Sequence, residues 1–113
     1  MKVLLFTREY PPHVYGGAGV HVEYLSAELA KLMDVEVRCF GDQDATSEGV
    51  RVKGYPFGKG SFARVDAKLS GALDTFETNL ATLTARVDAD LVHVHTWYAH
   101  LSGILSKILY GVP

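Results

Sequence analysis

Residues 2 to 33 read KVLLFTREYPPHVYGGAGVHVEYLSAELAKLM, and this stretch joins a short apolar run to a helical pattern through a loop rich in proline and glycine. The run at 3–6 is continuous rather than alternating, as in a parallel strand that is buried on both faces. From residue 21 onward the apolar side chains recur at helical intervals. We therefore expect a buried strand, a long loop and a helix whose apolar face covers the sheet; that face comprises Val22, Leu25, Leu29, Leu32 and Met33.

The rest of the chain continues this alternation of strands and helices. Segments 35–40 (VEVRCF) and 50–55 (VRVKGY) alternate apolar and charged residues as strands do, with a polar loop, GDQDATSEG, between them. Helical spacing runs from about 63 to 87 with a start near 61–62, a buried strand is expected at 88–96, and a last helix ends at Gly111. This order predicts an α/β fold with a Rossmann-like, mainly parallel sheet whose strands lie in the spatial order 3-2-1-4.

The composition is that of a folded globular domain and argues against several classes of partner. Of the 113 residues, 48% are hydrophobic and 21% charged, and the net charge is −2, so the chain lacks the basic character that nucleic acids and acidic membranes select. The opening MKVLLFT is too short for the apolar core of a signal peptide, and no stretch is long enough to span a membrane. Cys39 is the single cysteine, which fits a reducing compartment, so we expect the cytoplasm.

Two loops are expected to meet at one crevice. In an open α/β sheet, ligands bind beyond the carboxyl ends of the strands where the strand order reverses, here between the first and fourth strands. The loop after the first strand carries Gly16, Gly17 and Gly19, which allow a ligand to approach a helix N-terminus suited to phosphate. It matches neither GxGxxG nor a Walker A loop, and glycines that simply form the turn into the helix explain it equally well. Arg8 and Glu9 could act as acid, base or clamp, although charged loop residues are usually solvated.

The segment after the fourth strand supplies histidines and aromatic residues. His93 and His95 lie two apart and share one face of the strand, and His100 lies at or near the start of the next helix. HxH spacing can bind zinc, but no third ligand stands out, so no metal is expected. A buried, hydrogen-bonded structural role is expected for His93, whereas a substrate contact and a structural role are equally open for His95. Trp97 and Tyr98 can stack on a sugar or pack against the helix start.

Two segments carry a resemblance to a known family: KVLLFTREYPPHVYGGAGVHVEYLSAELAKL at 2–32 and LVHVHTWYAHLSGILSKILYGVP at 91–113. They closely resemble the opening of actinobacterial-type glycogen synthases, whose relatives include α-maltose-1-phosphate synthases and other retaining GT-B glycosyltransferases. The resemblance implies that the intact enzyme transfers glucose from ADP-glucose, or less favoured UDP-glucose, to an α-1,4-glucan or to glucose 1-phosphate. It implies retention of configuration, and neither a metal nor a cofactor.

The resemblance also implies roles for individual residues. His95 matches the histidine that contacts the transferred sugar near the reaction centre, and it is the expected catalytic residue. The glycine loop matches the loop that approaches the phosphate and sugar of the donor; the expected substrate-binding residues are Glu9, Tyr15, Gly16, Gly17, Gly19, Thr96 and Trp97. Val14 and Thr96 stand where many bacterial glycogen synthases have lysine and aspartate, which favours the maltose-1-phosphate branch and leaves the acceptor open. His100 stands where glycine is common.

The same resemblance assigns residues 1–113 to the first part of a GT-B N-terminal domain, with the C-terminal nucleotide-binding domain absent. Because that domain holds the groups that stabilise the departing diphosphate, we expect this fragment alone to be inactive. The alternatives are a non-catalytic sugar- or phosphosugar-binding module and, ranked third, a metal-dependent hydrolase built on HxH. An unpaired sheet edge is expected to allow self-association.

Overall fold

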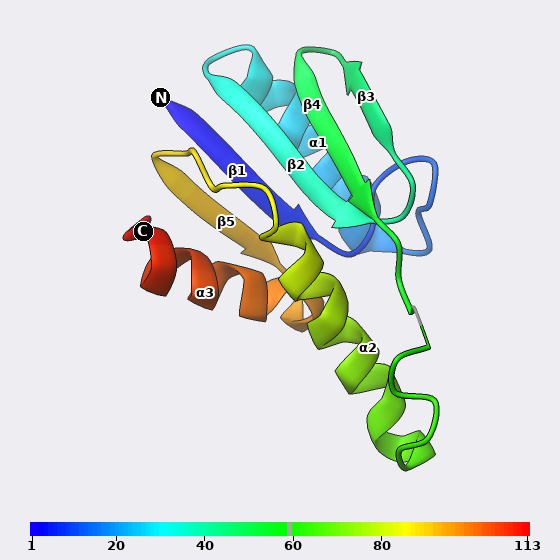
Figure 1. Ribbon diagram of the computed structural model, residues 1–113. Coiled ribbons are helices and arrows are strands. Elements are labelled where there is room, and N and C mark those ends of the chain that lie inside the picture. The colour runs from blue at the N-terminus through cyan, green and yellow to red at the C-terminus, as the bar shows by residue number, and fades with distance from the viewer. Residues whose placement is uncertain (59) are drawn as a thin grey trace.

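Parallel strands form the centre of the fold. In the computed structural model, which describes residues 1–58 and 60–113, four strands run parallel to one another: β1 (Lys2–Thr7), β2 (Asp34–Phe40), β4 (Val50–Tyr55) and β5 (Leu91–His95). With the antiparallel β3 (Asp44–Ser47), the strand order is β3-β4-β2-β1-β5 (Figure 1). The predicted α/β fold, with its Rossmann-like and mainly parallel sheet, is confirmed, and β1 lies between β2 and β5 as expected.

The segment predicted to be a polar loop at 41–49 instead contains β3. All of its residues are exposed, and they pair antiparallel with β4, with Ser47 opposite Val50. Glu48 (φ 50°) and Gly49 (φ 80°) form the connecting turn, and positive φ at both central residues is typical of tight hairpins. The pattern missed this strand because an exposed edge strand buries no side chains and so shows no alternation of apolar and polar residues.

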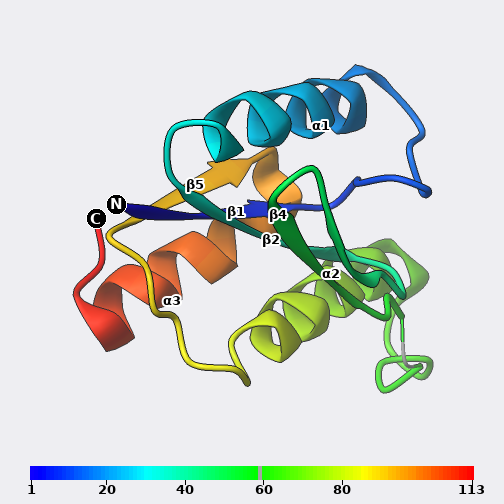
Figure 2. The ribbon, with the colours of Figure 1, turned by 90° about the horizontal axis from the view of Figure 1, so that it is seen from above.

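Helices cover both faces of the sheet, giving three layers (Figure 2). One helix packs on the first face, and two helices with a short 3-10 turn pack on the other. Their bounds are α1 (Gly17–Ala30) on the first face, and α2 (Ala67–Thr82), η1 (Trp97–Ala99) and α3 (His100–Tyr110) on the second.

The continuous apolar run of β1 is explained by these two layers. Val3 and Leu5 are buried in the cluster beneath α1, whereas Leu4 and Phe6 are buried on the other face. Val22 of α1 is fully buried, so the face predicted for this helix does cover the sheet. Beyond the end of α1, Leu32 of that face is exposed, whereas Met33 packs against the core.

Helix α2 is shorter than predicted and turns a polar face to the core. It begins after Asp66, whose carboxylate accepts a hydrogen bond from the Lys68 amide at 2.9 Å, rather than near 61–62. The apolar positions that suggested the helix include Leu69, Phe76 and Leu80, and all three are exposed. The buried side chains are Thr75, Thr78, Asn79 and Thr82. The threonine hydroxyls can be buried because each donates to a carbonyl in the preceding turn of the same helix.

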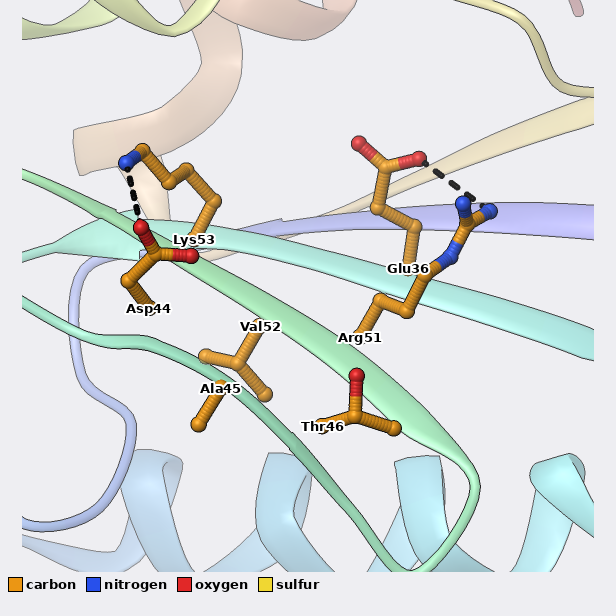
Figure 3. A pocket seen from close by; sticks show the side chains of 7 residues that line it. All are labelled: Glu36, Asp44, Ala45, Thr46, Arg51, Val52 and Lys53. Atoms are coloured by element: carbon orange, nitrogen blue, oxygen red, sulfur yellow. Dashed lines mark hydrogen bonds and ion pairs between the residues drawn. The ribbon is translucent and has the colours of Figure 1, made fainter.

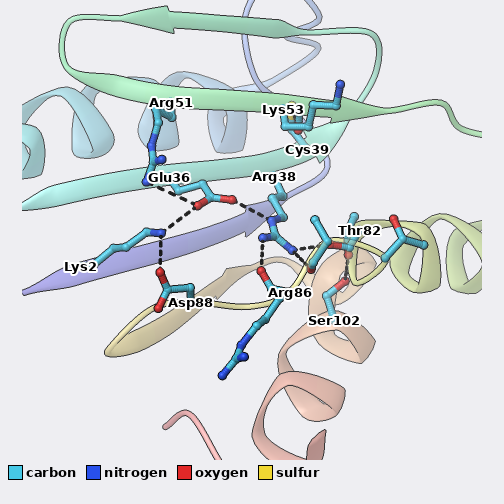
Figure 4. Close-up of polar contacts among 12 residues, drawn as sticks. Lys2, Glu36, Arg38, Cys39, Arg51, Lys53, Thr82, Arg86, Asp88 and Ser102 are labelled. Carbon is cyan, nitrogen blue, oxygen red and sulfur yellow. Dashed lines mark hydrogen bonds and ion pairs between the residues drawn. The ribbon is translucent and has the colours of Figure 1, made fainter. Parts of the chain in front are cut away.

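A buried arginine joins β2 to the end of α2 (Figure 4). Arg38 is 3% exposed, and its guanidinium donates at 2.7 to 2.9 Å to three carbonyls, those of Thr82, Ala85 and Arg86. Its Nε donates to Glu36 at 2.9 Å, and Lys2 lies 3.3 Å from the other carboxylate oxygen. Burial alone raises the pKa of Glu36, but Arg38 and Lys2 outweigh it and lower that pKa. Arg38 therefore places a positive charge where α2 ends, as a helix C-terminus favours.

Strand β5 lies at the edge of the sheet. His93 is exposed on it, so the buried position expected for this residue is wrong; an edge strand has no neighbour on one side to cover its side chains. Gly111 ends α3 in the left-handed conformation at φ 68°, as predicted. The chain then returns to β5, where the Val92 amide donates to the Pro113 carbonyl at 2.9 Å.

Candidate functional site

The carboxyl ends of β1 and β5 lie side by side, because Thr7 pairs with His95 in the parallel register. The loop after β1 and the segment after β5 therefore meet, as the topology predicted. Between them is a cavity of about 250 Å³, lined by Thr7, Arg8, Glu9, Ala18, Thr96 and Tyr98. Two of the residues expected at the site, Glu9 and Thr96, line this cavity directly.

Glu9 binds the glycine loop. Its two carboxylate oxygens accept hydrogen bonds from the amides of Tyr15 at 3.1 Å and Gly19 at 3.0 Å. A carboxylate here meets the positive end of α1 and one of the amides of its first turn. A Cβ added at Gly19 would lie 2.9 Å from the Cβ of Glu9 and 2.9 Å from a methyl group of Val14. Glycine at position 19 is therefore required by the packing of the loop itself.

Gly16 and Gly17 are not explained in this way. A Cβ added at either position would meet no atom within 4 Å. Gly16 has φ −165°, an extended conformation that any residue adopts. Tyr15 beside them is 77% exposed. The turn into the helix thus accounts for Gly19, whereas neither packing nor backbone conformation within the described chain requires glycine at 16 or 17.

Three histidines gather at the end of β5. The ring centroid of His95 lies 4.3 Å from that of His93 and 5.6 Å from that of His21 in α1. Burial, followed by the influence of His93 and His21, lowers the pKa of His95 to about 4, so this ring is neutral near pH 7. Its Nε2 atom is buried and has no hydrogen-bond partner among the described residues. A neutral imidazole of this kind can exchange hydrogen bonds with a hydroxyl group but is a poor proton donor.

In the segment after β5, the backbone of Thr96 is strained and the backbone of Tyr98 is held by a hydrogen bond. Thr96 has φ 67° and ψ 162°, a region that residues other than glycine seldom occupy. Trp97 is half-exposed and stacks on Tyr98, with ring centroids 4.3 Å apart. The carbonyl of Tyr98 accepts a hydrogen bond from Asn79 of α2 at 2.6 Å. The buried Asn79 side chain therefore holds this segment against α2.

The sequence pattern did not single out Asn79 or Phe57. Phe57 follows β4 and stacks on Phe40, with ring centroids 5.8 Å apart. The guanidinium carbon of Arg8 lies 5.7 Å from the Phe57 ring centroid and 4.3 Å from that of Tyr98. An aromatic residue just beyond a parallel strand was a usable signal for Phe57, because the carboxyl ends of such strands share one edge. No comparable signal marked Asn79, whose role depends on the packing of α2.

A larger hollow of about 410 Å³ lies along β3 and β4, away from this crevice (Figure 3). Its charged side chains are paired with one another: Lys53 lies 3.1 Å from Asp44, and Arg51 lies 3.8 Å from Glu36. Its lining comes from the lengths of the strands rather than from the loops after their carboxyl ends. In residues 1–58 and 60–113, no three His, Cys, Asp or Glu side chains are grouped so that they could hold a metal ion.

Comparison with known proteins identifies the family. Residues 15–113 match the model of Glycosyltransferase Family 4. The whole chain aligns with α-maltose-1-phosphate synthase of Mycolicibacterium smegmatis at 45% identity over 116 residues, covering 27% of that protein. Its counterpart in Mycobacterium tuberculosis is 43% identical over 117 residues, also 27% of its length. A glycogen synthase of Mycobacterium tuberculosis is 32% identical over 133 residues, or 32% of its length.

The chain thus spans about a third or less of the curated relatives that it matches. None of the helices in the described residues is both long and apolar enough to cross a membrane. The family match covers the glycine loop from Tyr15 onward and the whole segment after β5, whereas Thr7, Arg8 and Glu9 of the crevice precede it. The chain belongs to glycosyltransferase family 4.

Proposed function

We propose that the chain forms the first part of the N-terminal domain of a retaining GT-B glycosyltransferase. Its reaction would be transfer of glucose from ADP-glucose, or less favoured UDP-glucose, to an α-1,4-glucan or to glucose 1-phosphate, in glycogen biosynthesis. The observation that carries this proposal is the meeting of the glycine loop and the segment after β5 at one cavity. The three glycines of the loop and the segment after β5 lie in the region that matches the family.

The glycine loop is assigned to the donor. Gly16 and Gly17 leave open space where side chains would otherwise stand, and they lie at the N-terminus of α1, whose amides and dipole favour a phosphate. Glu9 keeps the loop in this shape through its bonds to Tyr15 and Gly19. The exposed ring of Tyr15 is available to pack against the donor.

The segment after β5 is assigned to the transferred sugar. His95 is proposed to contact a sugar hydroxyl through its buried Nε2, which has no hydrogen-bond partner among the described residues. The lowered pKa of His95 keeps the ring neutral for this contact. Thr96 and Trp97 have supporting roles: the half-exposed indole of Trp97 offers an apolar face of the kind that packs on sugars. Strain of the kind found at Thr96 is concentrated at functional sites.

The remaining catalytic groups are proposed to lie in a C-terminal nucleotide-binding domain. Electrostatic stabilisation of the charge that develops on a departing group usually contributes most to the rate enhancement of an enzyme. The 113 residues alone are therefore expected to have no measurable turnover. No metal or cofactor is part of the proposal. The buried free thiol of Cys39 is compatible with the cytoplasm.

Of the two acceptors, the relatives favour glucose 1-phosphate. Identity is higher to the α-maltose-1-phosphate synthases, at 45% and 43%, than to the glycogen synthase, at 32%. Val14 and Thr96, which replace the lysine and aspartate of many glycogen synthases, agree with that ranking. Glucose 1-phosphate is therefore our preferred acceptor.

The test is a transfer assay with the natural gene product at its full length. ADP-glucose and UDP-glucose are each combined with glucose 1-phosphate or a glucan, and NMR of the product reports the anomeric configuration. We expect release of the nucleoside diphosphate and a new α-linkage. Protein that binds sugar phosphate at the crevice but transfers glucose with none of these pairs would instead support the non-catalytic binding module.

A further inference from the structure

Arg8 is a cation held between aromatic rings. Its guanidinium carbon lies 4.3 Å from the Tyr98 ring centroid on one side and 5.7 Å from the Phe57 ring centroid on another. No carboxylate among the described residues lies within ion-pair distance of it. Stacking on a ring uses the face of the guanidinium and leaves the N–H groups in its plane free to donate. The fold therefore fixes the orientation of Arg8, but no carboxylate of the described residues forms an ion pair with it.

Arg8 also lines two adjoining cavities. The first is the crevice of about 250 Å³ described above. The second, of about 230 Å³, is lined by Arg8, His13, Tyr15, Phe40, Gly41 and Phe57. Glu9, the carboxylate in the first cavity, already accepts hydrogen bonds from two amides, and His13 in the second lies 2.6 Å from Asp42. Of the Arg, Glu and His side chains that line the two cavities, Arg8 is the one with no hydrogen-bond or ion-pair partner among the described residues.

Arg8 lies between the two cavities, and the second of them lies on the side of β1 away from β5. Arg8 faces Phe40 and Phe57, which lie at the ends of the neighbouring strands β2 and β4. His95 belongs to β5, on the other side of β1 in the sheet. An anion bound by Arg8 in the second cavity would therefore lie on the β2 and β4 side of β1, whereas His95 lies on the β5 side.

We infer that Arg8 binds the phosphate ester of a sugar 1-phosphate acceptor, through paired N–H donors, while the surrounding aromatic rings pack against the sugar. This inference rests on the proposed function and names the acceptor class of that site. A guanidinium suits this ligand because its planar fork matches two phosphate oxygens at once. An uncharged glucan end offers no such group, so Arg8 would select the phosphorylated acceptor.

The test is isothermal titration of the full-length gene product with glucose 1-phosphate, ADP and maltose. The variants are Arg8→Gln, Arg8→Lys and the matched control Arg51→Gln, which removes the same charge at the opposite end of the sheet, in β4.

We expect Arg8→Gln to weaken binding of glucose 1-phosphate by about tenfold to a hundredfold, since it removes hydrogen bonds to a charged group. Arg8→Lys, which keeps the charge but loses the fork, should fall between wild type and Arg8→Gln. Binding of ADP and of maltose by Arg8→Gln should stay within about twofold, because we propose that the nucleotide contacts lie in the C-terminal domain and maltose carries no phosphate. All binding by Arg51→Gln should stay within about twofold, because Arg51 lines neither cavity.

Three results would overturn the inference. They are no binding of glucose 1-phosphate by the wild type, equal binding by wild type and Arg8→Gln, and loss of ADP binding in Arg8→Gln, which would assign the arginine to the donor diphosphate. Should Arg8→Gln fail to fold, Arg8→Lys decides: wild-type affinity in that variant contradicts a bidentate contact. Wild-type protein that transfers glucose to a glucan but does not bind glucose 1-phosphate refutes this inference alone. Binding through Arg8 without any transfer refutes the proposed function alone.

Discussion

Thr96 is the residue whose backbone conformation is least suited to its side chain. At φ 67° and ψ 162°, a β-branched residue is strained by about 1 to 3 kcal/mol. We expect Thr96→Gly to raise the free energy of unfolding by about 1 kcal/mol, since relief of strain exceeds the entropy cost of glycine. Thr96→Ala keeps a Cβ and should show no such gain. Urea denaturation of the three proteins measures this, and destabilisation by Thr96→Gly would show that the conformation is not strained.

His95 makes stability depend on pH. Its native pKa of about 4 lies below its ordinary value of 6.5, so the unfolded chain binds the proton more readily. The contribution of His95 to the free energy of unfolding should therefore be fully present above about pH 6.5 and be lost as the pH falls towards 4. Because the ring is partly exposed and its charge is screened by solvent, we expect this loss to be about 1 kcal/mol. His95→Gln should remove this component. The check is urea denaturation of both proteins from pH 4 to 7; a constant difference between them would contradict the lowered pKa.

At the scale of elements, Arg38 is the main polar link between β2 and α2. Replacement by methionine would remove the donors to the carbonyls of Thr82, Ala85 and Arg86 and one partner of Glu36. We expect a loss of about 3 kcal/mol in the free energy of unfolding, as for other buried charged groups deprived of their partners. Arg38→Lys should lose less, because it keeps the charge but not the three-way hydrogen bonding. A loss below about 1 kcal/mol for Arg38→Met, in guanidinium denaturation, would show that water replaces these bonds.

Elements whose side chains are buried in a simple pattern were predictable, and the others were not. The continuous run of β1 and the spacing of α1 predicted the correct elements, because β1 buries apolar side chains on both faces of the sheet and α1 packs its apolar face against the sheet. Strand β3 is fully exposed, and α2 buries threonines while Leu69 and Leu80 are exposed. In neither element does the pattern of apolar residues predict which side chains are buried. His93 was placed wrongly because an edge strand and a central strand can carry the same residues.

The position of the crevice was predictable from the sequence, but the side-chain contacts around it were not. Strand order alone brings Thr7 beside His95, and this followed from the order of elements. The pairing of Arg8 with Tyr98 and Phe57, and the bond from Asn79 to the Tyr98 carbonyl, join residues far apart in sequence. Such contacts depend on the packing of α2 and of the segment after β4, which periodicity does not specify.

At the scale of the whole molecule, β5 lies at one edge of the sheet, where the Val92 amide bonds to the Pro113 carbonyl but no further strand among the described residues pairs with it. Unpaired strand edges act as templates for pairing, so we propose that the 113-residue chain self-associates through β5. Sedimentation should show a mass that rises with concentration. Leu91→Lys, at the start of this strand, should shift the chain towards monomer, because a charge on an edge strand opposes pairing.

Leu32→Lys is the matched control for this prediction. Leu32 is also exposed, but it lies beyond α1 rather than on the edge strand. It should leave the concentration dependence unchanged. Equal effects of the two substitutions would show that the chain associates through exposed apolar surface in general. A mass that does not depend on concentration would show that β5 does not mediate self-association.

The most direct measurement is the rate of glucose transfer by the full-length gene product carrying His95→Gln, compared with wild type and with His100→Gln. His100 is an exposed histidine at the start of α3, so it controls for loss of an imidazole. If the crevice between β1 and β5 is the transfer site, kcat/KM should fall by about a hundredfold or more in His95→Gln, as when a single preorganised hydrogen-bonding group is removed from an active site, while His100→Gln stays near wild type. A folded His95→Gln protein that transfers glucose at the wild-type rate would contradict the assignment of the site to this crevice.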